Sequence, residues 1–346
     1  MWSASKHESS ATVNHSRTTM KTQTPELRIG SIALAGKALA APMAGVSDRP
    51  YRRIARAYGA ALAVSEMVSS KPSLRNTALS RRRIDHQDEP GPISVQLLGA
   101  DPIEMAEAAR FNVDRGADII DINMGCPSKK VCNRMVGSAL LRDETLVGQI
   151  LESVVRAVEV PVTLKLRTGW DPEHRNGIQI ARIAEASGIQ ALAIHGRTRQ
   201  CKFKGAVEYD TIRRIKARTR IPVIANGDID TPAKAKAVMD YTGADGVMIG
   251  RAAQGQPWLF QRISDYLNTG DDPGDPPPAS KHDTLLQHLA ELYSLYGGTL
   301  GARIARKHVS WYTALMDNGR SLRRGFNLIE EPDDQIEFIS RNLSGP

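Results

Sequence analysis

The sequence predicts an α/β fold in which a closed (β/α)8 TIM barrel is followed by a small C-terminal helical domain. Eight short apolar runs recur through the chain, and amphipathic stretches with helical spacing lie between most of them. Alternating strands and helices favour a parallel sheet, and eight repeats fit a closed barrel better than an open sheet. Beyond about residue 268 the strand pattern ends, and the rest of the chain is helical in pattern.

The predicted strands are short runs rich in Val, Ile, Leu and Ala. They are Leu39–Met43, Leu62–Glu66, Ile93–Leu97, Ile119–Asn123, Val162–Leu166, Ala191–His195, Val223–Asn226 and Gly246–Gly250. The predicted helices include Pro102–Val113, Glu144–Val158, Ile178–Ala186 and Pro232–Met239. Asp101 and Thr231 each precede a proline, an arrangement typical of an N-cap residue followed by proline at the first helical position.

The chain divides into four segments. Residues 1–25 are polar and rich in Ser and Thr, and we expect them to be a disordered extension, with Met1 and Met20 both open as the start of translation. Residues 26–268 form the predicted barrel. Residues 269–280 read TGDDPGDPPPAS, which is typical of a stiff linker. Residues 281–346 form the predicted helical domain.

The composition indicates a reducing compartment and no membrane segment. The 346 residues include three cysteines, an odd number and too few for a disulfide framework. No apolar run approaches the roughly 18 residues that a membrane span needs, and the chain begins with no secretory signal. We therefore predict a cytoplasmic protein without a membrane partner. The net charge of +8 suits a phosphate-rich partner but is equally common on ordinary soluble proteins.

Polar or conformationally special residues stand at the end of nearly every predicted strand. They are Pro42-Met43, Glu66, Gln96, Asn123, Lys165, His195, Asn226-Gly227-Asp228 and Gly250-Arg251. Active sites of such barrels are built from the carboxyl ends of the strands, so we expect these residues to surround one mouth. The alternative is that each strand simply stops where polar residues begin. Eight such endings in succession favour the active site.

The ends of the seventh and eighth predicted strands suit a phosphate group. Gly227 and Gly250 let the backbone approach a phosphate closely, and backbone N–H groups with a helix N-terminus bind it. Arg251 adds a charged donor. Barrels repeatedly bind phosphate at this place. Ordinary tight turns are the alternative interpretation.

The other strand ends suit a flat flavin ring. Gln96 can both donate and accept hydrogen bonds, which matches the imide edge of a flavin. Lys165 provides a cation beside a reduced ring, and the run Pro42–Ala44 offers backbone and a soft side chain below it. These residues predict flavin mononucleotide (FMN) as the cofactor. No G-x-G-x-x-G run follows a strand, so a Rossmann nicotinamide site is not predicted.

Cys126 lies between a glycine and a proline, on a rigid turn just past the fourth predicted strand. Lys129 and Lys130 follow closely and are expected to modulate the thiol. A thiol here can be a proton donor, a nucleophile or inert, as most cysteines are. The position favours function for Cys126, whereas Cys132 and Cys201 are interpreted as inert.

Six runs of the sequence resemble the tRNA-dihydrouridine synthase family. They are Ala41–Asp48, Asp121–Pro127, Lys165–Gly169, Ile194–Thr198, Ala225–Asp228 and Ile249–Arg251. The resemblance extends in order from about residue 28 to about residue 330, with compatible spacing. The stretch Ile304–Tyr312 is similar to the bacterial B-type branch of that family.

The resemblance implies reduction of a uridine in the tRNA D-loop to 5,6-dihydrouridine, with FMN as cofactor and NADPH or NADH as reductant. It implies that Cys126 gives a proton to uracil C5 and that Asn123 and Arg167 contact the target uracil. Relatives often carry Asn where this chain has Cys132, which leaves one substrate contact open. No metal is expected. The residues implied to hold FMN are Pro42, Met43, Ala44, Gln96, Lys165, His195, Asn226, Gly227, Asp228, Gly250 and Arg251.

The segment 303–324 is strongly basic, with Asp317 as its single acidic residue. We expect Arg303, Arg306 and Lys307 to bind the phosphates of tRNA. Aromatic residues interleaved with or adjacent to these charges can stack on bases, but burial in a helical core is the favoured interpretation. These aromatic residues are Trp311, Tyr312 and Phe326.

Two other functions remain open. A dihydroorotate-dehydrogenase-like FMN oxidoreductase would share the barrel, the cofactor and the pyrimidine chemistry but act on a free base. The basic helical segment and the Cys126 turn speak against it. A non-catalytic tRNA-binding protein is the other alternative, and the presence of Cys126, Lys165 and Gln96 speaks against that. We expect a monomer.

Overall fold

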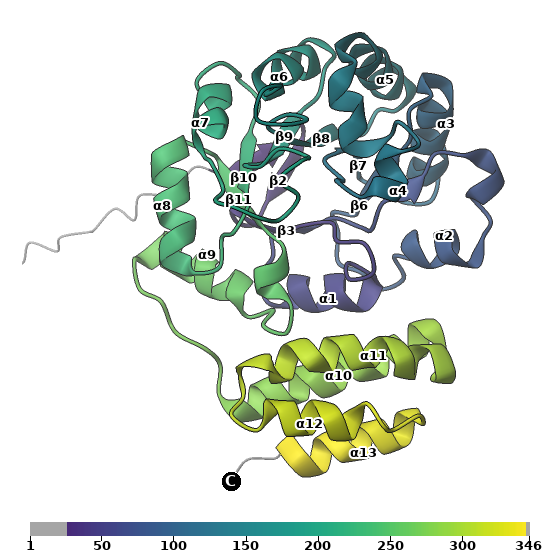
Figure 1. Ribbon diagram of the computed structural model, residues 1–346, viewed down its shortest axis with the longest axis vertical. Coiled ribbons are helices and arrows are strands. Elements are labelled where there is room, and N and C mark those ends of the chain that lie inside the picture. Colours follow the sequence, from purple (N-terminus) through teal and green to yellow (C-terminus); the bar gives the residue numbers. More distant parts are fainter. Residues whose placement is uncertain (1–25, 344–346) are drawn as a thin grey trace, which may run out of the picture.

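Residues 26–343 are described by the computed structural model, and they form a barrel with a helical region below it (Figure 1). Within this range nine parallel strands make one sheet in the order β4-β3-β11-β10-β9-β8-β7-β6-β5. Each of the eight predicted strands is present; the second is represented by the short β4, and β5 follows beyond its predicted end at Glu66. The strands are β3 Ala38–Ala40, β4 Leu62–Ala63, β5 Val68–Ser69, β6 Ser94–Leu98, β7 Ile119–Met124, β8 Val162–Arg167, β9 Ala191–His195, β10 Val223–Asn226 and β11 Gly246–Ile249.

The sheet closes on itself as a barrel. β11 pairs in parallel with β3, and a bridge between Val64 and Ser94 joins the second predicted strand to β6. The backbone N–H of Ser65 also donates to the carbonyl of Ser94 at 3.0 Å. The predicted (β/α)8 barrel with a helical region after it is therefore confirmed.

The helices that accompany the barrel strands begin and end close to the predicted positions. Asp101 caps α3 by accepting from two backbone N–H groups at 2.9 Å, and Thr231 caps α8 by accepting from one at 3.1 Å. α8 runs past the predicted end at Met239 to Thr242, because Gly243 with a φ of 70° supplies the left-handed cap. The helices are α1 Arg49–Ala57, α2 Ala78–Arg83, α3 Pro102–Val113, α4 Lys129–Cys132, α5 Glu144–Ala157, α6 Gly177–Ala186, α7 Asp210–Lys216, α8 Pro232–Thr242 and α9 Leu259–Thr269.

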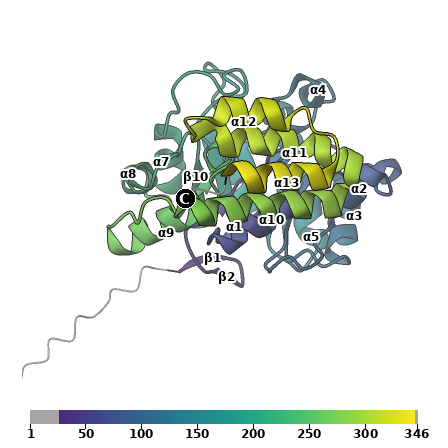
Figure 2. The same ribbon diagram turned by 90° about the horizontal axis from the view of Figure 1, so that it is seen from below.

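The amino end of the barrel is closed by a hairpin of β1 (Leu27–Ile29) and β2 (Ile32–Leu34), which pair antiparallel outside the barrel sheet. Figure 2 shows this hairpin on the opposite side of the molecule from α4. The hairpin shares a buried cluster with apolar residues of the barrel strands, including Leu39, Ile119, Ala191, Ala193, Ile224 and Met248.

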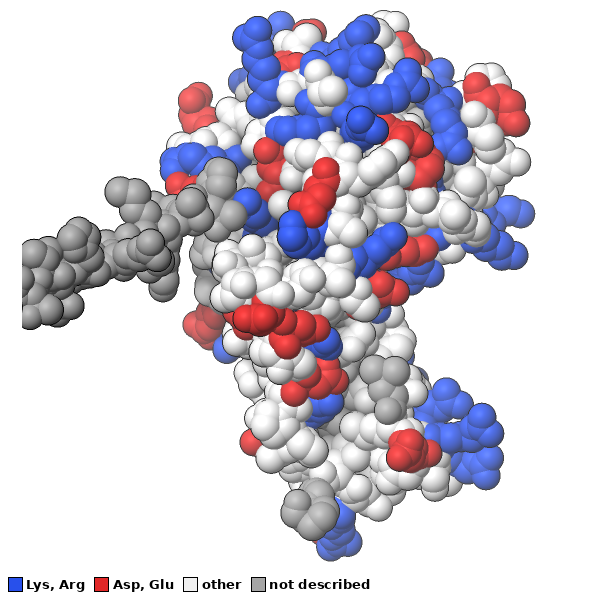
Figure 3. Space-filling model, turned by 90° about the vertical axis from the view of Figure 1, so that its left-hand side faces the viewer, with Lys and Arg blue, Asp and Glu red and all other residues white. Residues whose placement is uncertain are grey.

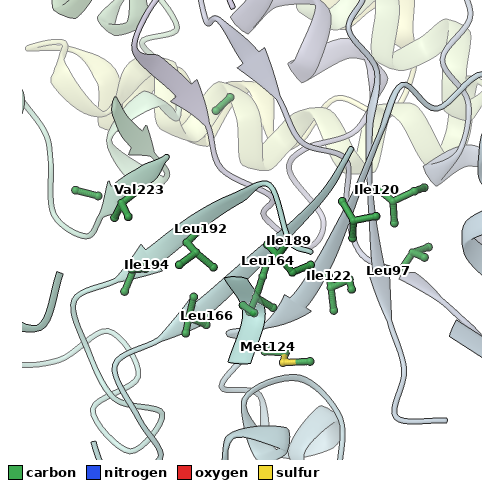
Figure 4. Packing of buried hydrophobic residues seen from close by; sticks show 14 of the residues in the cluster. Leu97, Ile120, Ile122, Met124, Leu164, Leu166, Ile189, Leu192, Ile194 and Val223 are labelled. Atoms are coloured by element: carbon green, nitrogen blue, oxygen red, sulfur yellow. The ribbon is translucent and has the colours of Figure 1, made fainter. Parts of the chain in front are cut away.

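Side chains alternate between the two faces of each strand, and this alternation positions the site. In β8, Leu164 and Leu166 belong to the main hydrophobic core, which packs the sheet against the helices (Figure 4). The residues between and beside them, Thr163, Lys165 and Arg167, therefore face the barrel interior. The polar members of the interior thus gather at the carboxyl end, opposite the hairpin.

The helical region has a hydrophobic core of its own. Its helices are α10 Pro278–Tyr296, α11 Gly298–Tyr312, α12 Gly319–Phe326 and α13 Pro332–Leu343, and α10 packs against α1 of the barrel. Tyr312 and Phe326 are buried in this core, which confirms the core interpretation for both. α10 begins inside the predicted linker 269–280. The predicted extension 1–25 lies outside the described residues.

Residues 26–343 include no helix that is both long and apolar enough to cross a bilayer. In the same range, no group of three or more His, Cys, Asp or Glu side chains is placed to hold a metal ion. Cys126, Cys132 and Cys201 are free thiols.

Candidate active site

A cavity of about 810 Å³ opens at the carboxyl ends of the barrel strands. Its volume falls within the range of about 300 to 1,000 Å³ that is typical of cofactor and ligand sites. Cys126, Asn123 and Arg167 line it. The residues that the resemblance implies for FMN all line the same cavity, namely Pro42, Met43, Ala44, Gln96, Lys165, His195, Asn226, Gly227, Asp228, Gly250 and Arg251.

A buried carboxylate orients two amide side chains at the cavity. Asp121 accepts from the Thr163 hydroxyl through Oδ1 and from Gln96 Nε2 through Oδ2, both at 2.6 Å. Gln96 Oε1 then accepts from Asn123 Nδ2 at 2.7 Å. Burial raises the pKa of Asp121 to about 6, against the opposing effects of these bonds and of Lys165, so the group is mostly ionised at neutral pH. Because an ionised carboxylate only accepts, it dictates which end of each amide donates.

The same hydrogen-bonded chain reaches the Cys126 turn. Asn123 Oδ1 accepts from the backbone N–H groups of Gly125 at 3.2 Å and of Cys126 at 3.0 Å. On the other side of the turn, the Cys126 carbonyl accepts from the Ser138 hydroxyl at 2.7 Å. Asp121 is therefore linked through two amides to the backbone of the candidate proton donor.

Burial raises the pKa of the half-buried Cys126 thiol. A backbone hydrogen bond in the turn and the positive charges of Arg167 and Lys165 oppose this rise without reversing it. The thiol is therefore protonated at neutral pH, as a proton donor must be. Lys129 and Lys130 are exposed to solvent, and Lys129 lines the cavity with Cys126.

Lys165, His195 and Asn226 form a polar wall of the cavity. Lys165 Nζ donates to Asn226 Oδ1 at 3.0 Å, and Asn226 Nδ2 donates to the Met248 carbonyl at 2.7 Å. Burial, and then the charge of Arg167, lower the pKa of Lys165 to about 8, which leaves it largely cationic at neutral pH. Burial and the surrounding cations hold the pKa of His195 far below its usual value, so the ring is neutral.

Charged side chains meet at the ends of β9, β10 and β11. Asp228 pairs with Arg197 through both carboxylate oxygens and with Arg251 Nη2 at 2.9 Å. Arg197 is almost fully buried, whereas the Arg251 side chain is about half exposed. Two guanidinium groups thus flank the turns that contain Gly227 and Gly250, where the sequence predicts a phosphate.

Arg167 forms hydrogen bonds to both the Cys126 turn and the loop after β9. Its Nε donates to the Gly125 carbonyl at 2.8 Å, and its Nη1 donates to the carbonyls of Thr198 and Lys202 at 2.9 and 2.7 Å. Burial lowers the pKa of Arg167 to about 10, so it is cationic at neutral pH. Direct contact of Arg167 with uracil stays a prediction.

Two charged residues of the site were missed from the sequence. Asp121 stands two residues before Asn123 on the same face of β7, so the period of a strand could have identified it. Arg197 stands two residues after His195, beyond the end of β9, where that period no longer applies.

Phe203, in the loop after β9, was also missed. It is 51 % exposed although it lines the cavity. Its ring lies near both Arg167 and Arg251, whose guanidinium carbons are 5.4 and 4.9 Å from the ring centroid. A single aromatic residue in a loop forms no pattern from which its place could be predicted.

The three basic residues predicted to bind tRNA lie on α11 and do not line the cavity. Arg303 is exposed to solvent. Arg306 Nη2 donates to the carbonyl of Ile329 at 3.1 Å, and Lys307 Nζ donates to the carbonyl of Gly45. Contact of these residues with RNA stays a prediction, and two of the three already have partners inside the protein.

The cavity fits an FMN molecule in three respects. His195 Nε2 is buried and has no hydrogen-bond partner among the described residues, so it is available to a ligand. Gly227 has a φ of 128°, and a Cβ there would approach Val207 and His195 within 3.0 to 3.1 Å, so this turn at the cavity requires a glycine, whose backbone can lie close to a ligand. Arg251 provides the matching positive charge beside that turn.

A family model described as dihydrouridine synthase matches residues 39–344. The chain belongs to the dihydrouridine synthase family. The matched residues include both the barrel and the helical region, so both parts of the chain belong to this family. Members of this family are flavin-dependent oxidoreductases, and the prediction of a flavin enzyme is confirmed. The family match therefore speaks against both alternatives, the dihydroorotate-dehydrogenase-like oxidoreductase and the non-catalytic tRNA-binding protein.

Curated bacterial relatives are similar over almost the whole chain. The tRNA-dihydrouridine synthase B of Pectobacterium carotovorum is 56% identical over 313 residues, which cover 90% of this chain and 98% of that protein. The protein of the same name from Pseudomonas aeruginosa is 55% identical over 313 residues, covering 90% of this chain and 94% of its own. The resemblance to the B-type branch is confirmed.

A solved structure of 2-naphthoyl-CoA reductase with 2-naphthoyl-CoA shares the fold. Its TM-score is 0.53 at 12% identity, over 69% of this chain and 51% of that chain. At this identity the likeness concerns the barrel architecture alone.

Proposed function

We propose that this chain reduces a uridine in the D-loop of tRNA to 5,6-dihydrouridine, with FMN as bound cofactor and NADPH or NADH as reductant. The observation that carries the proposal is a protonated thiol, Cys126, held by a hydrogen-bonded chain at the mouth of a flavin-sized cavity. Membership in the dihydrouridine synthase family supports the reaction. The relatives named tRNA-dihydrouridine synthase B support tRNA as the substrate.

The cavity residues would hold FMN in a single orientation. Gly227, Gly250 and Arg251 would bind the phosphate, and Gln96 and Lys165 would meet the polar edge of the ring. When bound, FMN supplies the hydride that adds to C6 of the uracil. Because Lys165 is largely cationic at neutral pH, it places a positive charge beside that edge.

Cys126 would supply the proton that completes the reduction. Hydride addition to C6 leaves negative charge on C5 and on the C4 carbonyl of the uracil, and C5 then takes a proton. A thiol that burial keeps protonated can donate it, and the thiolate that remains lies near the positive charges of Arg167 and Lys165. Solvent returns a proton to the sulfur before the next turnover.

The helical region, with proposed bounds 281–346, would bind the tRNA. Figure 2 shows α12 on the same side of the molecule as α4, which follows the Cys126 turn. Basic side chains gather on the helical region in the lower part of Figure 3, and the exposed arginines of α12 are Arg320, Arg323 and Arg324. Such residues neutralise phosphates. The target base must leave its stack to enter the cavity.

The oligomeric state and the cellular location are also proposals. We propose a monomer, since one chain supplies every residue assigned to the cavity. The three free cysteines are typical of a reducing compartment and support a cytoplasmic location.

The decisive experiment combines cofactor identification with mapping of the product. The purified chain should carry FMN, and with NADPH it should form dihydrouridine in the D-loop of tRNA from a strain that lacks the modification. A chain that binds no flavin, or that leaves every uridine of the D-loop unreduced, would contradict the proposal.

A further inference from the structure

The loop from β3 to α1 forms part of the cavity through the run Pro42–Ala44. The loop is a compact turn, in which the Met43 carbonyl accepts from the backbone N–H groups of Val46 and Ser47, each at 2.9 Å. The Ser47 hydroxyl donates to the Ala41 carbonyl and accepts from the Met43 N–H, also at 2.9 Å. These bonds fix the shape of the loop, but none of them attaches its tip to the rest of the protein.

The barrel holds the tip of this loop from one side. Glu66 Oε2 accepts from the backbone N–H of Gly45 at 2.6 Å. The Glu66 side chain is almost fully buried, and its charge is met by Arg83 at 3.3 Å. Glu66 ends a predicted strand and was expected at the mouth. Its role is instead to hold the loop that carries Pro42–Ala44.

The helical region holds the same loop from the other side. Lys307 of α11 donates from Nζ to the carbonyl of Gly45. Tyr296 of α10 donates from its hydroxyl to Asp48 Oδ2 at 2.9 Å, while Asp48 Oδ1 accepts from the backbone N–H of Tyr51 and caps α1. The two side chains thus fix the tip and the end of the loop.

We propose that Lys307 and Tyr296 are positioning residues for the cofactor cavity, so that the helical region holds the loop through which Pro42–Ala44 would contact a bound flavin. The inference rests on the proposed function. The Gly45 peptide is held by Glu66 at its N–H and by Lys307 at its carbonyl.

Removal of Lys307 would have two consequences for the loop. It would leave the Gly45 carbonyl without its charged donor, and it would remove a cation beside the carboxylates of Asp48 and Glu66. Both changes let the tip of the loop move and weaken the support for a bound ring.

The expected role of Lys307 as an RNA contact competes with this assignment. The ammonium has three N–H donors and the Gly45 carbonyl takes one of them, so the two roles are distinguished by which ligand a variant affects. Arg303 on the same helix is exposed, and it provides the matched comparison. The two residues should affect different ligands, FMN for Lys307 and tRNA for Arg303.

The test measures FMN binding without turnover. The chain is freed of flavin and titrated with FMN, whose fluorescence reports binding. Lys307→Met should raise the Kd for FMN roughly tenfold, and Tyr296→Phe, which removes a weaker donor, roughly threefold. Lys307→Arg keeps the charge and the donor and should restore most of the affinity. In Lys307→Met, amide hydrogen exchange should speed up at Gly45, Val46 and Ser47.

Binding of tRNA supplies the control. Lys307→Met should leave tRNA affinity within about twofold of the original, whereas Arg303→Met should lower tRNA affinity and leave FMN affinity unchanged. Unchanged FMN affinity in both Lys307→Met and Tyr296→Phe would overturn the inference, as would a loss of tRNA affinity alone. If the unmodified chain binds FMN but forms no dihydrouridine, the proposed function fails while the positioning role stands.

Discussion

The barrel mouth and helix α11 both carry polar residues predicted to be functional, yet their positions follow from the sequence to different degrees. Parallel strands bring all their carboxyl ends to one edge, so residues as distant as Gln96 and Arg251 line one cavity. On α11, Arg303 faces solvent, while Arg306 and Lys307 donate to carbonyls inside the protein. The direction of a strand decides where its last residue lies. Whether a helix side chain is exposed or bonded inside the protein depends instead on what packs beside the helix.

The largest expected effect concerns Cys126, at the mouth. Cys126→Ala should keep flavin binding and flavin reduction by NADPH, because the thiol donates a proton only to the uracil. Dihydrouridine formation should fall by about 10²- to 10⁴-fold, the usual contribution of a general acid. Single-turnover assays of the reduced enzyme with tRNA measure this step directly.

Cys201→Ala is the matched control, since Cys201 is half-buried like Cys126 but does not line the cavity. It should leave the single-turnover rate within about twofold of the original. An unchanged rate in Cys126→Ala would mean that Cys126 is not the proton donor. The residues at the strand ends would then predict where the cavity lies but not which residue acts in it.

The second effect concerns Asp48, where the barrel meets the helical region. Burial raises the pKa of Asp48 from 3.8 to about 6, with Glu66 adding to the rise and Tyr51, Tyr296 and Lys307 opposing it. Between these two pH values the folded chain holds a proton that the unfolded chain has released. The contribution of Asp48 to the free energy of unfolding is therefore greatest below about pH 4. It falls by about 3 kcal/mol as the pH rises from about 4 through about 6.

Asp48→Asn removes this titration while an amide oxygen can still cap α1. The free energy of unfolding of the variant, relative to the original chain, should therefore improve by up to about 3 kcal/mol between about pH 4 and about pH 7. Urea unfolding across this range measures the difference. A difference that does not change with pH would mean that Asp48 is ionised throughout and that its site between the regions is well solvated.

The fold followed from the sequence because its signals are local. Each buried strand is a short apolar run, and the caps Asp101 and Thr231 need only their own helices. The interruption between β4 and β5 left no such signal, and Glu66 contacts Gly45, a residue of another loop that no local pattern indicates.

The candidate site followed only in part. Its strand-end members are set by topology, but their partners depend on tertiary packing. Asp121 orients Gln96 through a contact between neighbouring strands, and Arg197 reaches Asp228 from a loop. Which amide end donates, or which arginine is buried, depends on atoms that are far apart in the sequence.

The third effect concerns this partner network. Asp121→Asn keeps the shape of the side chain but can donate as well as accept, so the amide of Gln96 loses its fixed orientation. We expect the Kd for FMN to rise roughly tenfold, about 1.4 kcal/mol. Titration of the flavin-free protein with FMN measures it.

Asp240→Asn provides the same chemical change in an exposed ion pair with Lys236 on α8. It should alter the Kd for FMN by less than about twofold, because such surface pairs contribute little. Equal effects of Asp121→Asn and Asp240→Asn would mean that the orientation of Gln96 does not matter for the flavin.

The smallest effect concerns the solvent-facing side of α11. Arg303→Glu should weaken tRNA binding by a few-fold and lower the slope of log affinity against log salt by about one. Arg306→Glu should instead lower the free energy of unfolding, since its guanidinium donates to Ile329. Arg156→Glu, an equal charge change on the exposed face of α5, should affect neither. If Arg303→Glu and Arg306→Glu weaken tRNA binding equally, then the contact of Arg306 with Ile329 does not keep Arg306 from binding RNA. The basic pattern of the sequence would then have predicted the RNA contacts better than the packing of α11 does.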